Sequence, residues 1–371
     1  VICCLLSLCM IGGYIMATNN RLAHEKIIKL LFSLAIPSII AQLVNILYNI
    51  VDRIYIGQMA NGTIAMAALS VTLPIVTFVS AFTQLVGVGG APLCAMIENS
   101  DQHSKDYSLL KECMRPGHSD YPAYVKYHGY NDVRGGGHFS GRLTAPIVFA
   151  GSVAKQILRQ KGIIVGAHIQ SIKDVYDDSF GVDITCEDLQ QLTKQQYPTL
   201  NSDVFLKMQN VIEDARMKQD SVGGTIECAI INVPAGLGNP FFDSIESHLS
   251  PLLFSIPAVK SVSFGMGEKM SELYGHEAND CYYYEGEKVK TKTNHNGGIT
   301  GGISNGMPIV FKVAIKPTPS ISQVQSTINV KTKENTKLEI TGRHDPCIVP
   351  RAVVVVESMA AIGILDMMKD I

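Results

Sequence analysis

The densest group of chemically active side chains lies between residues 115 and 146, in the sequence RPGHSDYPAYVKYHGYNDVRGGGHFSGRLTAP. Three arginines and two histidines surround three consecutive glycines; they are Arg115, His118, Arg134, His138 and Arg142. Guanidinium groups bind phosphate or carboxylate through paired N–H donors, and histidine transfers protons near neutral pH. Glycine lets the backbone approach a ligand closely. The segment predicts a site for a small phosphorylated anion, and a basic, glycine-rich surface loop is the alternative.

A second candidate segment covers residues 294–321, NHNGGITGGISNGMPIVFKVAIKPTPSI. Two glycine pairs precede a predicted strand, and that strand ends in Lys316-Pro-Thr-Pro-Ser. Such backbone can line a flat cofactor or its phosphate, because glycine allows close approach. Glycine turns before strands are common, so this segment alone is weak evidence for a cofactor site.

A third candidate segment covers residues 342–352, GRHDPCIVPRA, where Arg343, His344 and Asp345 are consecutive. Adjacent histidine and aspartate are compatible with acid–base chemistry or with a simple surface pair. The dipeptide Asp345-Pro346 also predicts an ordinary helix start. No histidines occur as HxxxH and no cysteine pair accompanies them, so the sequence predicts no metal site.

Composition sets limits on the class of protein. The 371 residues carry a net charge of -2, which gives no argument for nucleic acid as a partner. The nine cysteines include no CxxC pair, and their odd number argues against a complete disulfide framework. We therefore expect reduced thiols and a cytoplasmic enzyme.

The first quarter of the chain differs from the rest. Residues 30–51 and 63–86 are two uncharged stretches long enough to cross a bilayer, and the only charged residues between Lys29 and Glu98 are Asp52 and Arg53. They predict two membrane helices, or a pair of buried helices in a soluble protein. Membrane contact is therefore expected through residues 30–86, and residues 1–15 are interpreted as read-through upstream of a start at Met16.

From residue 98 onward the pattern is that of a globular α+β protein. Apolar periodicity predicts helices over residues 148–158, 203–219 and 350–370. Apolar runs predict strands over residues 162–169, 223–234 and 307–317. The tyrosine-rich stretch at residues 282–294 is predicted to be a polar loop.

The three candidate segments, in this order, strongly resemble chorismate synthase. RPGHSDY, RGGGHFSGR, NHNGGITGGIS, KPTPSI and GRHDPC each look like signatures of that family, and VPAGLGNPFFDSIESHLS, SIPAVKSV and GHEAND match between them. The resemblance runs from about Gly90 to the C-terminus. It implies a β-α-β sandwich, a homotetramer, and elimination of phosphate from 5-enolpyruvylshikimate 3-phosphate to give chorismate. The reaction needs reduced FMN, without net redox change, and the family is associated with NADP in supplying it.

The resemblance also implies roles for individual residues. Arg115, Arg142 and Arg343 resemble the arginines that bind the substrate's phosphate and carboxylates. His118 resembles the histidine that donates a proton beside the flavin, and Asp345 resembles the aspartate that assists deprotonation near flavin N5. The residues that resemble flavin contacts are His138, Phe139, Ser140, Pro257, Ala258, Gly301, Lys316, Pro317, Thr318, Pro319, Ser320 and Arg343.

Residues 16–96 resemble a different family, the first two helices of a MATE-type multidrug efflux transporter. We interpret the chain as a chimera joined near residues 89–96, with domains at 1–15, 16–96 and 97–371. The family's GESHG-type motif, which carries a second catalytic histidine, and its RRRPG-type motif are both missing from residues 1–89. We therefore expect an inactive or nearly inactive chorismate synthase; the alternatives are a transporter fragment with a passenger domain and a membrane-anchored synthase.

Overall fold

The computed structural model describes residues 95–97, 111–340 and 345–368. The apolar stretches 30–51 and 63–86, the fifteen leading residues, most of the predicted join and Arg343 lie outside the described residues. Within the described part, no helix is long and apolar enough to cross a membrane. The described residues belong to one compact unit that begins at Ala95.

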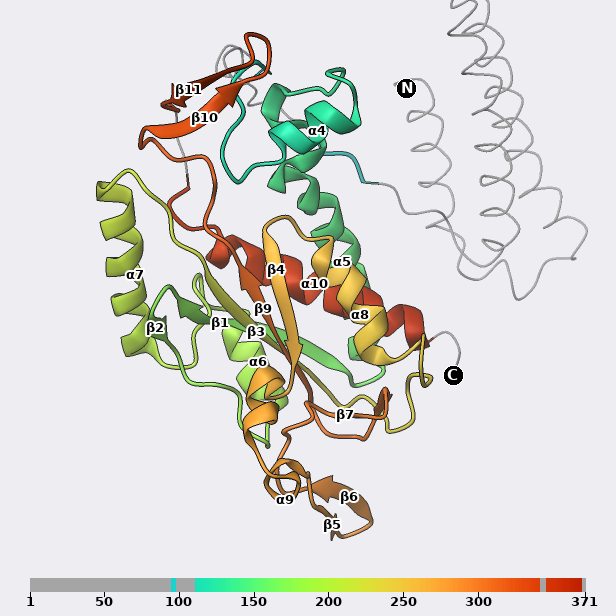
Figure 1. Cartoon of the computed structure of the whole chain (residues 1–371). Helices are drawn as coiled ribbons and strands as arrows, with labels where there is room; N and C mark the ends of the chain where they lie inside the picture. The colour runs from blue at the N-terminus through green and yellow to red at the C-terminus, as the bar shows by residue number, and fades with distance from the viewer. Residues whose placement is uncertain (1–94, 98–110, 341–344, 369–371) are drawn as a thin grey trace, which may run out of the picture. The chain divides into compact units, whose positions relative to one another are not determined.

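Helices and strands alternate irregularly along this unit (Figure 1). The helices are α4 (Asp120–Lys126), η3 (Arg134–Phe139), η4 (Gly141–Leu143), α5 (Thr144–Gln160), α6 (Cys186–Leu192), α7 (Ser202–Met217), α8 (Ile245–Phe254), η5 (Gly267–Glu272), α9 (Gly275–Ala278) and α10 (Val349–Met367). The strands are β1 (Ile164–Ile172), β2 (Val175–Tyr176), β3 (Gly224–Ile231), β4 (Val259–Phe264), β5 (Tyr282–Glu285), β6 (Lys288–Thr291), β7 (Ile299–Thr300), β8 (Ile303–Ser304), β9 (Ile309–Ile315), β10 (Gln325–Asn329) and β11 (Glu334–Leu338).

The centre of the unit is a five-stranded sheet in the order β2-β1-β3-β9-β4. Every neighbouring pair is antiparallel. The remaining sheets in the described residues are two-stranded: β5-β6, β7-β8 and β10-β11. The predicted α+β class is thus confirmed. Of the β-α-β sandwich that the resemblance implies, the described residues contain one large sheet and its helices.

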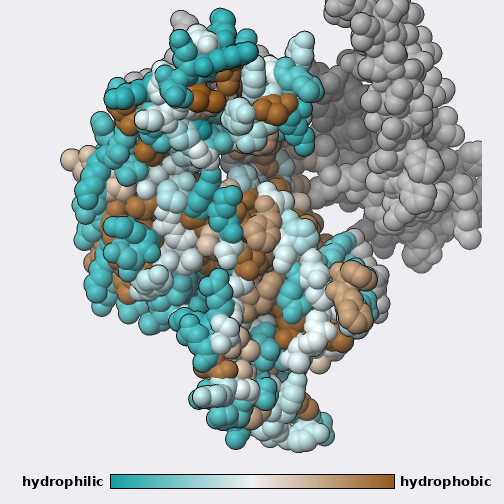
Figure 2. Space-filling model, viewed as in Figure 1, coloured by the Kyte–Doolittle hydropathy of each residue, from teal (hydrophilic) through white to brown (hydrophobic). Residues whose placement is uncertain are grey.

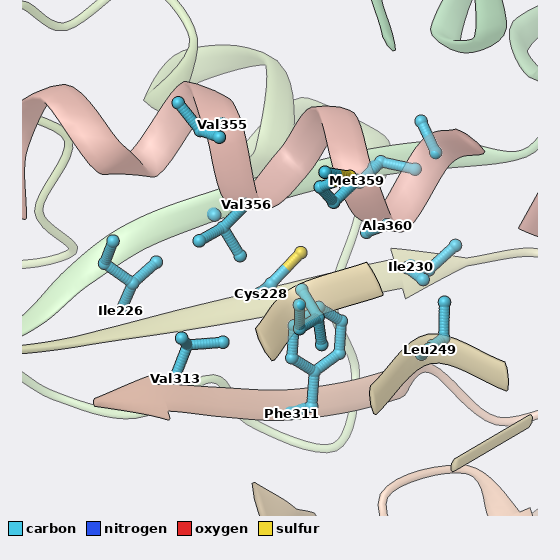
Figure 3. Packing of buried hydrophobic residues seen from close by; sticks show 14 of the residues in the cluster. Ile226, Cys228, Ile230, Leu249, Phe311, Val313, Val355, Val356, Met359 and Ala360 are labelled. Carbon is cyan, nitrogen blue, oxygen red and sulfur yellow. The ribbon is translucent and has the colours of Figure 1, made fainter. Parts of the chain in front are cut away.

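One face of the central sheet is covered by α5, α8 and α10, as Figure 1 shows. Alternate residues of β3 and β9, including Ile226, Cys228 and Phe311, point into this core. Figure 3 shows them packed against Val356 and Met359 of α10. Most of α10 is buried because its sequence is apolar almost all round.

Helices α5 and α10 approach each other closely at Gly151. A Cβ at this position would lie 2.2 Å from Cβ of Ser358, so only glycine allows this crossing. The opposite face of the central sheet is covered by α6, whose Leu189 and Leu192 contact Ile164 and Val310. Strands β1, β3 and β9 are therefore mostly buried on both faces, as their apolar sequences predicted, and the edge strands β2 and β4 are more exposed.

The predicted helices and strands of the globular part are confirmed, with small shifts at their ends, in α5, α7, α10, β1, β3 and β9. The predicted loop at residues 282–294 is wrong, because Tyr282–Thr291 form the hairpin β5-β6. Glu285 pairs with Lys288, and the turn between them contains Gly286 with φ of 64°. Aromatic and β-branched residues favour strands even when most of the side chains are exposed.

The helix start predicted at Asp345-Pro346 is also wrong. Helix α10 begins at Val349, and Pro350 occupies its first turn. Proline is favoured there because the first N–H groups of a helix have no partner within it. Asp345 instead forms an ion pair with Arg351, with 2.6 Å between Oδ2 and a guanidinium nitrogen.

Candidate active site

The chain reaches the candidate site along the β10-β11 hairpin. The amide of Met114 donates to the carbonyl of Ile328 at 3.2 Å, and the amide of Val330 donates to the carbonyl of Glu112 at 2.9 Å. Cys113, between them, forms an isolated antiparallel bridge with Asn329. Residues 112–114 therefore run beside β10 and deliver Arg115 to a fixed position just before α4.

Arg115 and Asp120 form a nearly buried two-point ion pair. Arg115 Nε donates to Oδ2 of Asp120 at 2.7 Å, and Nη2 donates to Oδ1 at 2.8 Å. Each side chain is only 9% exposed. Burial by itself would raise the pKa of Asp120, but hydrogen bonds from Arg115 and then His118 outweigh it and hold that pKa well below its usual range.

His118 completes this group. Its Nδ1 lies 2.6 Å from Oδ1 of Asp120 and 3.1 Å from Nη2 of Arg115. The side chain is 16% exposed. We refer to Arg115, His118 and Asp120 as the RHD cluster. It unites a cation, a carboxylate and a group that can carry a proton within six residues of sequence.

Residues 316–320 contact the RHD cluster from the far end of β9. Nη1 of Arg115 donates to Oγ of Ser320 at 3.0 Å, across 205 residues of sequence. Nζ of Lys316 donates to the carbonyl of Gly117. Gly117 has φ of 69°, a conformation that glycine adopts without strain. Two of the three sequence segments singled out for chemistry thus meet in one place.

The third segment is linked through Thr318. Its hydroxyl donates to the carbonyl of Asp345 at 2.8 Å, and its own carbonyl accepts from the hydroxyl of Ser221 at 2.7 Å. The amide of Lys316 donates to the carbonyl of Ala258 at 3.0 Å, which places Pro257 and Ala258 at the same end of the sheet.

Two lysines, Lys260 and Lys316, lie near each other at this end of the sheet. The pKa of Lys316 is lowered, first by burial and then by repulsion from Lys260. A lysine in that position gains from a nearby negative charge, because an anion removes both penalties on its charged form. Arg115 is paired to Asp120, whereas Lys316 donates to a backbone carbonyl and has no carboxylate partner among the described residues.

Other predicted site residues lie on other elements of the fold. His138 and Phe139 are exposed at the end of η3, and Arg142 is exposed in η4, where its amide donates to Oγ of Ser140 at 3.3 Å. Gly301 lies between β7 and β8, at the opposite end of β9 from Lys316. A seven-residue strand is about 20 Å long, so Gly301 does not join the RHD cluster within one chain. Arg343 lies outside the described residues.

Two of the surface pockets among the described residues contain no predicted site residue. One is lined by residues of the 180–184 loop, α6 and the 195–200 loop. The other lies between α5 and α10 and is lined in part by Lys155 and Ser358. The candidate site is therefore defined by hydrogen bonds between its residues, and it lies in neither of these two pockets.

Sequence reasoning missed two groups of polar residues. Asp120 was not singled out, although it stands two residues after His118 in RPGHSDY. The second group is a buried row on the central sheet, in which His168 contacts Asp177 and Glu227. Its signal was one histidine in the otherwise apolar strand IVGAHIQSI.

The described residues therefore define an α+β protein in which a cation, a carboxylate and a histidine meet residues 316–320. Two family models match the chain: chorismate synthase over residues 75–369 and MatE over residues 37–103. The first match covers most of the chain and every described residue of the candidate site. The two matches overlap over residues 75–103, which include the stretch where the sequence predicts a join.

Curated relatives agree with the first match. The chorismate synthase of Dehalococcoides mccartyi is 44% identical over 288 residues, 75% of this chain and 76% of that protein. That of Pyrococcus abyssi is 46% identical over 277 residues, with the same coverage. A crystal structure of a chorismate synthase matches 68% of this chain and 70% of its own, with a TM-score of 0.55 and 26% identity. The chain belongs to the chorismate synthase family, whose members are lyases.

Proposed function

We propose that this chain has chorismate synthase chemistry, the elimination of phosphate from 5-enolpyruvylshikimate 3-phosphate to give chorismate. The observation that carries the proposal is the contact between the RHD cluster and residues 316–320. It brings Lys316 against the residue before His118, across 199 residues of sequence, and Ser320 against Arg115, across 205. Family membership supports the same reaction.

The cations of the site stabilise the charge that develops on the leaving phosphate. Fixed positive groups are more effective than water in this role, because they need no reorganisation during the reaction. Lys316 is held at the site through Gly117, and Arg142 stands exposed before α5. We assign substrate or cofactor phosphate to these two side chains, together with Arg343. Arg115 is engaged by Asp120, Ser320 and His118, so it organises the site.

His118 and Asp345 are the proposed proton carriers. His118 presents its ring at the junction of the two segments and is partly exposed, so it can meet a bound molecule. Asp345 is 40% exposed and paired with Arg351. Through Thr318 its backbone is tied to the same end of the sheet. A carboxylate in this position can accept a proton once a ligand displaces solvent.

The described residues fit part of a flavin site. Lys316–Ser320, Pro257 and Ala258 lie together, with a cation and backbone groups suited to a flavin or its phosphate. When bound, reduced FMN supplies an electron transiently to the breaking C–O bond. Gly301 does not fit the same flavin within one chain, since β9 separates it from Lys316.

A second copy of the chain accounts for Gly301. We propose that the family's homotetramer brings Gly301 of one copy to the flavin held by another. The loop beside it carries Phe241 and Phe242, which are 89% and 92% exposed. This loop is tied to the glycine hairpin by the amide of Ile245, which donates to the carbonyl of Gly302 at 3.0 Å. Figure 2 shows hydrophobic residues in separate patches among hydrophilic ones on one face of the molecule.

The role of Lys316 is tested by Lys316→Met. We expect FMN to bind the wild-type chain with a change in its visible absorbance, and the variant to bind it about 10- to 100-fold more weakly, since a charge-assisted hydrogen bond contributes about 1.5–3 kcal/mol. Lys207→Met, on the exposed face of α7, is the matched control and should not change the affinity. Equal affinities for the wild type and Lys316→Met, or no FMN binding at all, would contradict the proposal.

The MatE match supports a second proposal, about residues 16–96 alone. We propose that they are a transporter-derived segment joined to the synthase domain near residues 89–96, and that any membrane contact of the chain is made by residues 30–86. A transporter needs both of its helical bundles to enclose a pathway. Sequencing a single DNA molecule across the junction tests this directly, and a continuous chorismate synthase reading frame upstream of Gly89 would refute it.

A further inference from the structure

We propose that Asp120 is the positioning residue of the site: it fixes the Nδ1–H tautomer of His118, so that Nε2 is the atom that exchanges a proton with the ligand. Arg115 acts through Asp120 by holding its carboxylate in place. The role of Nε2 in proton exchange rests on the proposed function. The tautomer of His118 can be measured without any turnover of substrate.

The short contact between His118 and Asp120 requires a proton between the two atoms. Nδ1 and Oδ1 lie 2.6 Å apart, and two lone pairs at that distance would repel each other. The low pKa of Asp120 places the proton on the imidazole and leaves the carboxylate charged. In neutral His118 the lone pair is then on Nε2, which is the nitrogen free of the carboxylate.

The proton on Nδ1 also excludes a hydrogen bond between Nδ1 and Arg115. Nη2 of Arg115 lies 3.1 Å from Nδ1, but both atoms then carry hydrogens and neither accepts. Nη2 therefore donates to Oδ1 of Asp120, at 2.8 Å. The guanidinium and the imidazole share one carboxylate oxygen, and they are held side by side by it.

Asp120 is suited to this role because several hydrogen bonds hold its carboxylate in one orientation. The carboxylate accepts from the amide of Arg115 at 3.1 Å, from Nε at 2.7 Å and from Nη2 at 2.8 Å, besides His118. It is 8% exposed. Ser320 accepts from the remaining side of the guanidinium, at 3.0 Å. The orientation of His118 is thereby tied to residues 316–320, where the ligand's anionic groups are expected.

The test is the tautomer of His118, read from nitrogen-15 NMR of the full chain labelled at histidine. The His118 signals are assigned by their loss in His118→Gln, and spectra are recorded at a pH high enough to remove imidazolium signals. We expect the Nδ1–H tautomer in the wild type. If the wild-type chain shows the Nε2–H tautomer, the proposal is overturned whatever the variants do.

Asp120→Asn should reverse the tautomer. The amide oxygen is expected to keep the two donors at Oδ2, the Arg115 amide and Nε, which places the –NH₂ group against His118. That group donates, so Nδ1 must accept and Nε2 takes the proton. Glu213→Gln, exposed on α7, is the matched control and should leave the tautomer unchanged. An unaltered Nδ1–H tautomer in a folded Asp120→Asn chain would also overturn the proposal.

This experiment distinguishes a failure of the positioning role from a failure of the proposed function. If His118 has the expected tautomer but the chain binds no FMN, the positioning role stands and the proposed function fails. If the chain binds FMN and makes chorismate while His118 is in the Nε2–H form, the proposed function stands and the positioning role fails.

Discussion

The 371-residue chain is expected to form chorismate about 10²- to 10⁴-fold more slowly than its curated relatives, the usual cost of losing a general acid. Residues 1–89 contain no GESHG-type motif, and they therefore do not supply the second histidine that the family resemblance assigns to phosphate departure. His118 and the cations of the site remain. In the proposed function these groups bind the ligand and carry one proton, and the general acid for the leaving phosphate is the group that residues 1–89 do not supply.

The measurement is an anaerobic assay with reduced FMN, in which chorismate is followed by its absorbance. The chorismate synthase of Pyrococcus abyssi, 46% identical over 277 residues, is measured under the same conditions as the reference. FMN affinity is measured on the same samples to show that the site is present. A rate within tenfold of the reference would contradict the expectation and would mean that another group of this chain replaces the missing histidine.

His168→Phe is expected to lower the free energy of unfolding by about 3–5 kcal/mol near neutral pH, the typical cost of breaking a buried ion pair. His168 is completely buried, with Nδ1 3.2 Å from Asp177 and Nε2 2.9 Å from Glu227. Both ring nitrogens face carboxylates, so both donate and the imidazole is charged. Removing it leaves two buried carboxylates without their shared cation.

The same three side chains, His168, Asp177 and Glu227, should make the free energy of unfolding depend on pH. Burial alone would lower the pKa of His168, but its hydrogen bonds to Asp177 and Glu227 raise it above the ordinary 6.5. Its contribution is therefore complete below that value and is lost as pH rises through the folded-state pKa. The pKa values of Asp177 and Glu227 are lowered despite burial, so their contribution is lost as pH falls through those values. The difference between wild type and variant should be largest between these limits.

Chemical denaturation of both chains over a range of pH measures this difference. His276→Phe, at an exposed position in α9, is the matched control and should stay close to wild type. Asp177 also accepts from the amides of Leu200 and Asn201, at 2.6 and 3.0 Å, so the 199–201 loop should lose protection from hydrogen exchange in the variant. A pH-independent loss below 1 kcal/mol would show that the row contributes little.

The parts of the fold that sequence could predict are those fixed by local apolar pattern. Helix α10 is an apolar run of 19 residues, whereas β1, β3 and β9 are apolar runs of 9, 8 and 7 residues, and run length separates a buried helix from buried strands. The hairpin β5-β6 was missed because most of its side chains are exposed, so burial left no pattern to read. The start of α10 was misplaced because Asp345 binds Arg351 of the first turn instead of capping the helix itself.

The candidate site was predictable in its members and not in its geometry. Family resemblance grouped Arg115, His118 and residues 316–320, but no local pattern shows that segments 205 residues apart touch. Asp120 and His168 were missed for a related reason. The partner of a buried charge is decided by tertiary contacts, and the sequence shows only that a charged residue stands near a histidine. Gly301 is the opposite case. Its sequence motif matches the family, but β9 separates it from Lys316.

Hydrogen-exchange mass spectrometry of the full chain, with FMN and 5-enolpyruvylshikimate 3-phosphate added together, tests the central claim most directly. We predict that peptides covering residues 112–120 and 316–321 both gain protection from hydrogen exchange, while exchange in peptides covering residues 181–195 does not change. Protection of only one of the two segments, or of neither, would contradict the claim that they form one binding site.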